Sequence, residues 1–317
     1  MYKLIRIFNQ NRRKILIVIL IIVFVIFIIQ LLNYFAQNKQ NNYNKQNNII
    51  MKNTNNTGEL ISNKSAISGE NVSENKLKKD TDIIKKFLNY CNEGNKESAY
   101  EMLTDECKEV MFPTIQDFEN IYYSNIFNGE QKNYTIENLM GDTYEVKFSG
   151  DILGTGKLDE EDRLDNITLI KEGQDYKLNI NNYVERKEKN KTTEDKKIRI
   201  TILNVDTYMD YEVYNLSIEN NSDHTIMLDT NDDSKSVYLE DSKKMKYYFY
   251  NNEIIQNRLE IQSKFKGNIQ IKFNNSYSSS RSIKNLVFSK IILDYDSYKN
   301  LQNKDDYDDF FEFKVNV

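Results

Sequence analysis

The stretch IIKKFLNYCNEGNKESAYEMLTDECKEVMFPTIQDF, residues 83–118, sets the architecture of the first folded part of the chain. Its apolar residues recur three and four positions apart, as they do on one face of an amphipathic helix. We predict a first helix that is capped by Asp80 or Thr81 and ends at Gly94, because glycine favours the left-handed backbone that follows a helix. Two shorter helical segments follow before Pro113.

The residues after Pro113 begin a further helix and then change period. Thr114 and Asp117 have the spacing of a capping box, and the apolar residues behind them repeat at helical spacing: Ile115, Phe118, Ile121 and Tyr122. From residue 133 onward the apolar period is two, which predicts strands. These strands are NYTIENL (133–139), TYEVKF (143–148), DNITLIK (165–171) and YKLNINNYV (176–184). Helices followed by an antiparallel meander predict an α+β domain over residues 78–184.

This order of elements resembles a known family. The helix, the short turn around SAYEML and the second helix in residues 83–118 look like the opening of the NTF2-like cone fold, which is found in many exported bacterial proteins. The resemblance covers about residues 80–184. It implies a curved sheet wrapped over the helices and a pocket between them, and it implies no single activity.

Residues 198–317 read as strands throughout. Apolar and aromatic residues alternate in KIRITILNV, YEVYNLSIEN, SVYLE, GNIQIKF, LVFSKIILDY and FFEFKVNV, with Asn, Ser, Asp and Gly between them. This spacing predicts an all-β sandwich. The segment resembles the immunoglobulin-like domain at the C-terminal end of membrane proteins and lipoproteins of Clostridium-type Firmicutes, a family without a defined activity.

The N-terminal region predicts a membrane anchor. Residues 15–35, ILIVILIIVFVIFIIQLLNYF, match the ~20 apolar residues that span a bilayer as a helix. Residues 1–14 carry five basic and no acidic residues, so the positive-inside rule keeps them in the cytoplasm and exports the rest. A cleaved signal peptide would need a shorter apolar region and small residues before the cut, and neither is present. We therefore expect a single-pass membrane protein with the bilayer as its first partner.

Two polar segments are predicted to connect the folded parts. Residues 36–77 are rich in Asn and contain few large apolar residues, so we expect a disordered tether. Residues 185–197, ERKEKNKTTEDKK, are predicted to be a charged linker between the α+β domain and the sandwich. The richness in Asn, Lys and Ile is typical of a Gram-positive bacterium with a low-GC genome.

One acidic segment has the spacing of a calcium loop. DTNDDSKSVYLE, residues 229–240, places Asp229, Asn231, Asp233 and Glu240 in a twelve-residue frame. An EF-hand requires Gly at the sixth position and helices on both sides, whereas this frame has Ser and strand-like flanks. We favour a solvated turn between strands and keep a calcium site in a sandwich loop as the alternative.

Other signals of chemistry are weak, and we expect neither catalysis nor a cofactor. GTGK, residues 154–157, lacks the first Gly and the final Ser or Thr of a phosphate loop. His224 is the only histidine, which excludes a multi-histidine metal site. Cys91 and Cys107 lie on neighbouring predicted helices, where we expect buried free thiols and keep a disulfide as the alternative.

The remaining predictions concern partners. A net charge of −5 with interleaved signs argues against a nucleic-acid partner, because a phosphate-binding protein concentrates Lys and Arg. Four consecutive aromatic residues form either core or an exposed contact surface: Tyr247, Tyr248, Phe249 and Tyr250.

The sequence thus favours a non-catalytic, membrane-anchored extracytoplasmic binding or scaffold protein of a bacterial envelope, whose partner is an envelope protein or small ligand. Two alternatives stay open. The first is a structural subunit of a conjugation- or sporulation-type channel, which ring formation would indicate. The second is an enzyme or ligand-binding domain that uses an NTF2-like pocket, which a deep cavity with converging acidic or tyrosine side chains would indicate.

Overall fold

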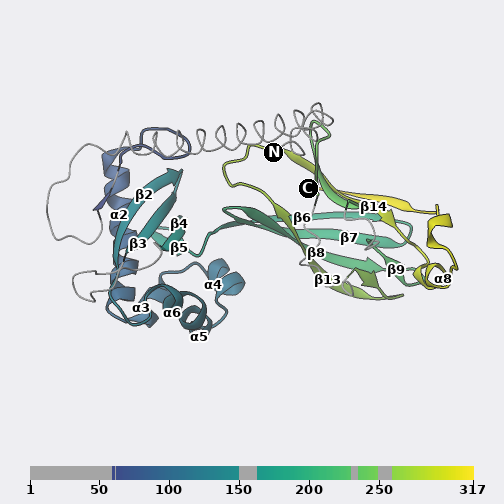
Figure 1. Cartoon of the computed structure of the whole chain (residues 1–317), viewed down its shortest axis with the longest axis horizontal. Coiled ribbons are helices and arrows are strands. Elements are labelled where there is room, and N and C mark those ends of the chain that lie inside the picture. Colours follow the sequence, from purple (N-terminus) through teal and green to yellow (C-terminus); the bar gives the residue numbers. More distant parts are fainter. Residues whose placement is uncertain (1–58, 61, 150–162, 230–234, 249–258) are drawn as a thin grey trace, which may run out of the picture. The chain divides into compact units, whose positions relative to one another are not determined.

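The computed structural model describes residues 59–60, 62–149, 163–229, 235–248 and 259–317, which are drawn as the coloured ribbon in Figure 1. Residues 57–317 form one compact unit. The predicted transmembrane segment, residues 15–35, lies outside the described residues. Within the described ranges, no helix combines the length and the apolar character needed to cross a membrane.

The first lobe begins with its longest helix, α2 (Glu74–Asn92), which starts earlier than predicted. Ser73 is the N-cap, and its hydroxyl accepts the N–H of Lys76. Asp80 and Thr81, which the sequence favoured as caps, are instead buried in the second turn of the helix. The helix ends as predicted, because Gly94 has a φ of 72°.

Shorter helical segments complete the helical part of this lobe. They are α3 (Lys96–Glu101), α4 (Asp105–Met111), α5 (Ile115–Phe118), the π-helical turn η1 (Glu119–Tyr123) and α6 (Ser124–Ile126). The capping box of Thr114 and Asp117 is confirmed. Phe118 and Tyr122 are buried, but Ile115 and Ile121, which the spacing placed on the same face, are 37% and 46% exposed. Ile121 lies within the wider π-helical turn, which departs from the regular helical period on which the prediction was based.

The helices pack on a five-stranded sheet in the order β1-β2-β3-β4-β5. The strands are β1 (Glu59–Leu60), β2 (Asn133–Met140), β3 (Thr143–Ser149), β4 (Arg163–Glu172) and β5 (Asp175–Asn179). β2 to β5 pair antiparallel in chain order, as predicted, and β1 joins β2 in parallel. Gly141 and Gly173 have positive φ in two of the hairpin turns. The two sides share a core of aromatic and aliphatic residues.

The lobe also includes residues that the sequence assigned to the disordered tether. The N–H groups of Ala66 and Ile67 donate to the carbonyls of Asn138 and Leu139, at 2.8 and 3.0 Å. The buried Ser65 hydroxyl donates to the Asn138 side chain. The boundary predicted at residue 78 is therefore wrong, since the polar segment before it is tied to strand β2.

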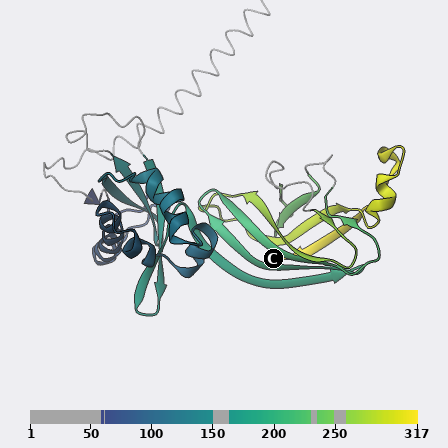
Figure 2. The same ribbon diagram turned by 90° about the horizontal axis from the view of Figure 1, so that it is seen from below.

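The second lobe consists of two four-stranded sheets, in the orders β13-β8-β7-β6 and β11-β10-β14-β15, with a small β12-β9 pair. Its elements are β6 (Tyr183–Asp195), β7 (Ile198–Tyr208), β8 (Tyr211–Asn220), β9 (Ile226–Met227), β10 (Val237–Asp241), β11 (Lys246–Tyr248), β12 (Glu260–Ile261), β13 (Lys266–Asn274), β14 (Ile283–Ile291), α8 (Tyr295–Lys299), η3 (Lys304–Asp306) and β15 (Phe311–Asn316). Both sheets contribute to one core, and Figure 2 shows them as separate layers. The predicted β-sandwich arrangement of sheets is therefore present.

The segment predicted as a charged linker is instead strand β6 (Tyr183–Asp195). Its residues pair antiparallel with β7 along nearly the whole length of that strand, with two register shifts. Tyr183 is fully buried in the core of the first lobe. Charged side chains are tolerated here because β6 is the edge strand of its sheet.

An ion pair at the start of β6 joins elements of the two lobes. The Arg186 guanidinium donates from Nε to Oδ1 of Asp206 at 2.7 Å and from Nη2 to Oδ2 at 3.2 Å. The side chains of Arg186 and Asp206 are only 12% and 3% exposed. Arg186 Nη1 also donates to Glu109 on α4, and Asn215 on β8 donates to Asp206. Because α4 and β8 belong to different lobes, this cluster couples them.

Candidate functional site

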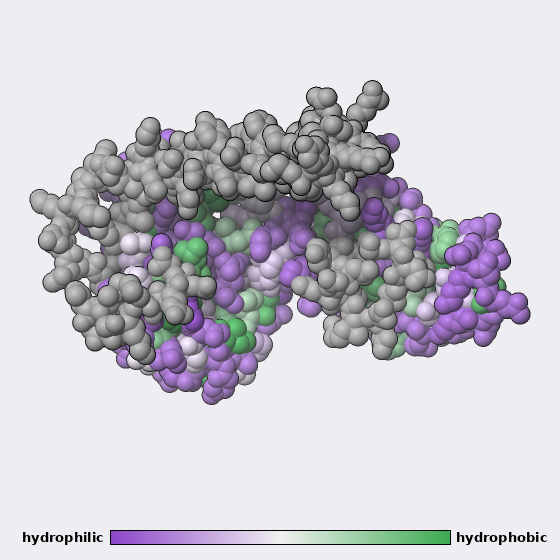
Figure 3. All heavy atoms as spheres, in the orientation of Figure 1, coloured by the Kyte–Doolittle hydropathy of each residue, from purple (hydrophilic) through white to green (hydrophobic). Residues whose placement is uncertain are grey.

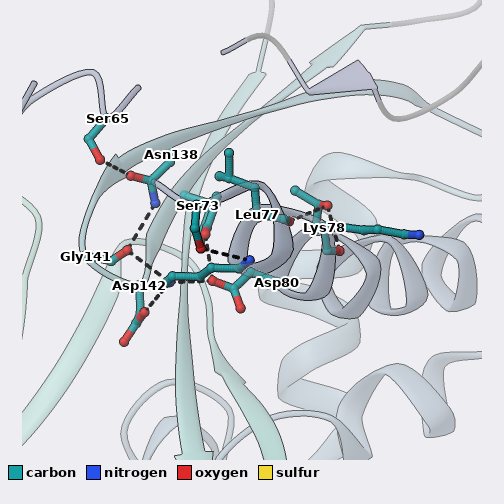
Figure 4. A network of polar contacts seen from close by, with 11 residues as sticks. Ser65, Ser73, Leu77, Lys78, Asp80, Asn138, Gly141 and Asp142 are labelled. Atoms are coloured by element: carbon teal, nitrogen blue, oxygen red, sulfur yellow. Dashed lines mark hydrogen bonds and ion pairs between the residues drawn. The ribbon is translucent and has the colours of Figure 1, made fainter. Parts of the chain in front are cut away.

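A polar network fixes the N-terminal half of α2 against the sheet (Figure 4). Lys76 Nζ lies 2.5 Å from Oδ2 of Asp80 and 2.6 Å from Oδ1 of Asp142 in the β2–β3 turn. The Tyr144 hydroxyl donates to the same Asp80 oxygen at 2.7 Å. Burial works to lower the pKa of Lys76, but the hydrogen bonds to Asp142 and Asp80 outweigh it and raise that pKa well above its usual value. Lys76 is therefore a permanent cation at this site.

Beside this network, depressions follow the outer face of α2 from Lys76 to Glu93. We call them together the α2 groove. Three adjoining depressions of about 430, 620 and 460 Å³ make it up. Tyr176 on β5 lines the first two, and Lys86 and Tyr90 line the second two. The groove thus combines one helix face with the β4–β5 hairpin, which lies far from it in the chain.

The groove carries unpaired positive charge beside tyrosine rings. Lys79 Nζ lies 4.3 Å from the ring centre of Tyr176, and Lys86 Nζ lies 5.9 Å from that of Tyr90. Lys79, Lys86 and Lys171 form no ion pair with another described residue. Acidic side chains line all three depressions, so the groove carries both signs of charge: Asp80, Asp142, Glu97, Glu101, Asp175, Asp82 and Glu93. Such a surface suits a ligand with carboxylate or phosphate groups next to apolar parts.

The interior of the lobe holds one perturbed carboxyl group. The Tyr122 hydroxyl donates to Oδ2 of Asp165 at 2.7 Å, and the Asn182 N–H donates to Oδ1 at 3.3 Å. Burial raises the pKa of Asp165 to about 6, against the lowering effect of these hydrogen bonds. A carboxyl group with this pKa could exchange protons near neutral pH, but Asp165 lines none of the three depressions of the α2 groove. Its Oδ2 is occupied by the Tyr122 hydroxyl, and its Oδ1 holds the β5–β6 turn, where Asn181 and Asn182 have positive φ.

Cys91 and Cys107 are free and fully buried in the same core. Burial raises the pKa of Cys107 to about 12 and raises the pKa of Cys91 further still. A thiol that stays protonated is a poor nucleophile and a poor metal ligand, so these side chains act as small apolar groups.

The calcium candidate is only partly described, because Asn231 and Asp233 lie outside the described residues. Asp229 is buried and its Oδ1 accepts the Ser236 hydroxyl. Glu240 lies on β10, where Asn285 donates to its carboxylate at 3.1 Å. Over the described ranges, no group of three or more His, Cys, Asp and Glu residues is placed to hold a metal ion. The calcium site stays a prediction.

Two of the four consecutive aromatic residues, Tyr247 and Tyr248, belong to the described part of the chain. Tyr247 is partly buried, its ring lies 4.7 Å from the Arg281 guanidinium carbon, and its hydroxyl donates to Asp241 at 3.2 Å. Tyr248 is 41% exposed. Phe249 and Tyr250 lie outside the described residues. The two described tyrosines thus divide between the core and the surface.

His224 is exposed in its loop, and its Nδ1 lies 3.5 Å from Asp294. The phosphate-loop-like GTGK at 154–157 lies outside the described residues.

The α2 groove and the Asp165 site were not among the sequence predictions. The one signal for the groove was the excess of lysine on the polar face of α2, which is also typical of any solvated helix. Asp165 had been assigned only to a strand. No family model, curated protein or solved structure matches the chain.

Proposed function

We propose that the chain is a membrane-anchored, extracytoplasmic binding or scaffold protein of a bacterial envelope that carries out no catalysis. Its partner is a protein or peptide that lies in the α2 groove and places carboxylates beside Lys79 and Lys86. In this proposal residues 15–35 span the bilayer, and the positive-inside rule directs the two lobes outward. The first lobe is NTF2-like and the second immunoglobulin-like, an inference supported by the helix-then-meander order and the two-sheet sandwich.

The observation that carries the proposal is the contrast between interior and surface of the first lobe. Its inner titratable groups are committed to structural bonds, as the Tyr122 hydroxyl donated to Asp165 illustrates. The cations of the groove are open to solvent, and Lys79, Lys86 and Lys171 are exposed. Fixed tyrosine rings beside free ammonium groups favour recognition of acidic and apolar groups together, which is binding chemistry.

Site-specific photocrosslinking tests the groove. A photoreactive phenylalanine derivative in place of Tyr176 in the full chain, expressed in its own cells, should form one discrete adduct. The same probe in place of Lys187, which is exposed on β6, is the matched control and should form none. The double variant Lys79→Glu and Lys86→Glu should abolish the adduct at 176. Equal adducts at both positions, or an adduct that survives charge reversal, would overturn the groove as the binding site.

Protease protection tests the location. An epitope tag after Val317 should be removed when protease is added to intact protoplasts, and it should survive only if the lobes are cytoplasmic. Protection of the tag in intact protoplasts, with digestion after lysis, would overturn the extracytoplasmic assignment.

A further inference from the structure

The hairpin that joins β10 to β11 carries a concentrated positive charge at its tip. Residues 242–248, SKKMKYY, contain three lysines and no acidic residue, in a chain whose net charge is −5. All three lysines are exposed. Met245 is 58% exposed and Tyr248 is 41% exposed, and both belong to the small set of large exposed apolar side chains. Cationic and apolar groups therefore share one tip.

The tip has a fixed shape. The buried Asp241 carboxylate accepts the N–H groups of Lys243 and Met245 through Oδ1, each at 2.8 Å. The Asp241 N–H donates to the Met245 carbonyl at 3.1 Å, and Lys244 has a φ of 63°. This is a three-residue hairpin loop that ends in a left-handed residue. The side chains of the tip are thus presented by a preformed turn.

The Lys243 and Lys244 charges are open to a partner, whereas the Lys246 ammonium also hydrogen-bonds to the Tyr238 side chain. Within the described part of the chain, Lys243, Lys244 and Lys246 form no ion pair. Lys246 Nζ lies 4.3 Å from the ring centre of Tyr238, and that ring packs edge-on against Tyr248 at 5.7 Å. The coloured atoms visible in Figure 3 are largely hydrophilic, with separate hydrophobic patches between them.

We propose that the tip, residues 242–248, docks on the surface of an anionic lipid bilayer, with its lysines at the headgroups and Met245 and Tyr248 in the interfacial region. This inference rests on the proposed membrane tether, which would hold the lobe near the bilayer. Lysines beside an interfacial aromatic ring are the combination that binds anionic membranes, because charge attracts the tip and apolar side chains retain it. A soluble polyanion would use the charges alone and leave Met245 in water.

Vesicle co-sedimentation of residues 57–317, which form one compact unit, tests the inference. The protein should bind vesicles of phosphatidylglycerol mixed with phosphatidylcholine and should dissociate from them as the salt concentration rises. It should not bind vesicles of phosphatidylcholine alone. Each lysine near an anionic surface contributes about 1 kcal/mol, roughly five-fold in affinity, so Lys243→Gln with Lys244→Gln should weaken binding about 25-fold. Lys189→Gln with Lys191→Gln on β6 is the charge-matched control and should bind like the wild type.

A tryptophan reporter separates insertion from simple charge attraction, because the chain contains no Trp. Emission from Tyr248→Trp should shift to shorter wavelength with the anionic vesicles. Phe265→Trp, at a site 51% exposed in the β12–β13 turn, is the matched control and should not shift. Inorganic polyphosphate should leave both spectra unchanged.

Three results would overturn the inference. They are no binding to anionic vesicles, an equal loss of vesicle affinity in the two lysine double variants, or an equal emission shift of Tyr248→Trp with polyphosphate and with vesicles. These failures would leave the anchor and the α2 groove untouched. Conversely, a tag protected in intact protoplasts would overturn the extracytoplasmic proposal without changing what purified protein does on vesicles.

Discussion

Replacing Arg186 by Leu should destabilise the protein by about 3 kcal/mol, because it leaves the Asp206 carboxylate buried without its cation. Breaking a buried ion pair costs about 3–5 kcal/mol when one charge is left unpaired. The lower end applies here, since Asn215 Nδ2 still donates to Asp206 Oδ2 at 2.7 Å. The contact with Glu109 adds little, because that side chain is 71% exposed.

Urea unfolding of residues 57–317, followed by far-UV circular dichroism, measures this loss. The slope of the unfolding free energy against urea concentration should equal that of the wild type, because the same surface becomes exposed on unfolding. Arg199→Leu is the matched control: Arg199 also bonds two acidic residues, but its side chain is 41% exposed, so we expect a much smaller loss of stability than for Arg186→Leu. Adding Asp206→Asn to Arg186→Leu should recover part of the stability, because the buried charge is gone.

The reasoning would be refuted if Arg186→Leu cost no more than Arg199→Leu. It would also be refuted if Asp206→Asn made the Arg186 variant still less stable, since the penalty would then not come from an unpaired carboxylate.

Three further predictions concern the first lobe. The pKa of Asp165 is raised in the folded protein to about 6, above its unfolded value of about 3.9. Its contribution to folding stability is therefore fully present below about pH 4 and is lost as pH rises through about 6. Urea titrations at a series of pH values should therefore show the wild type losing about 3 kcal/mol over that window relative to Asp165→Asn. Cys91 and Cys107 should not react with a thiol reagent in the native protein and should both react in denaturant; rapid native labelling would contradict their burial. Asp80→Ala should cost about 2 kcal/mol because a buried tyrosine hydroxyl loses its acceptor, whereas the exposed Asp82→Ala on the same helix should stay within about 0.5 kcal/mol; equal effects would contradict the network.

Strands were the most predictable part of the fold, because burial on one face imposes an alternation that is visible in the residues. Tyr214, Leu216 and Ile218 alternate along β8 and are all buried. The start of α2 was missed because its cap, Ser73, lies in a polar run that resembles a tether. Strand β6 was missed for a different reason. Its pairing with β7 is made by the backbone, which leaves no apolar pattern in its exposed half.

The candidate site was less predictable than the fold. The α2 groove depends on Lys79 meeting Tyr176, and a contact between residues so far apart in the chain leaves no local signature. Asp80 looked like a helix cap because Asp is common at that position. Only the fold reveals that its partner is Tyr144 on β3. The exposed lysines of the β10–β11 tip, by contrast, were visible in the sequence next to the aromatic run.

The continuity of strand β6 has a mechanical consequence. A force that enters through the first lobe passes to the sandwich along β6, in the direction of the strand itself. The hydrogen bonds between β6 and β7 lie across that direction, so they are loaded together in shear and do not open one after another like a zipper. A pull between the two lobes would thus be carried by the β6–β7 pairing.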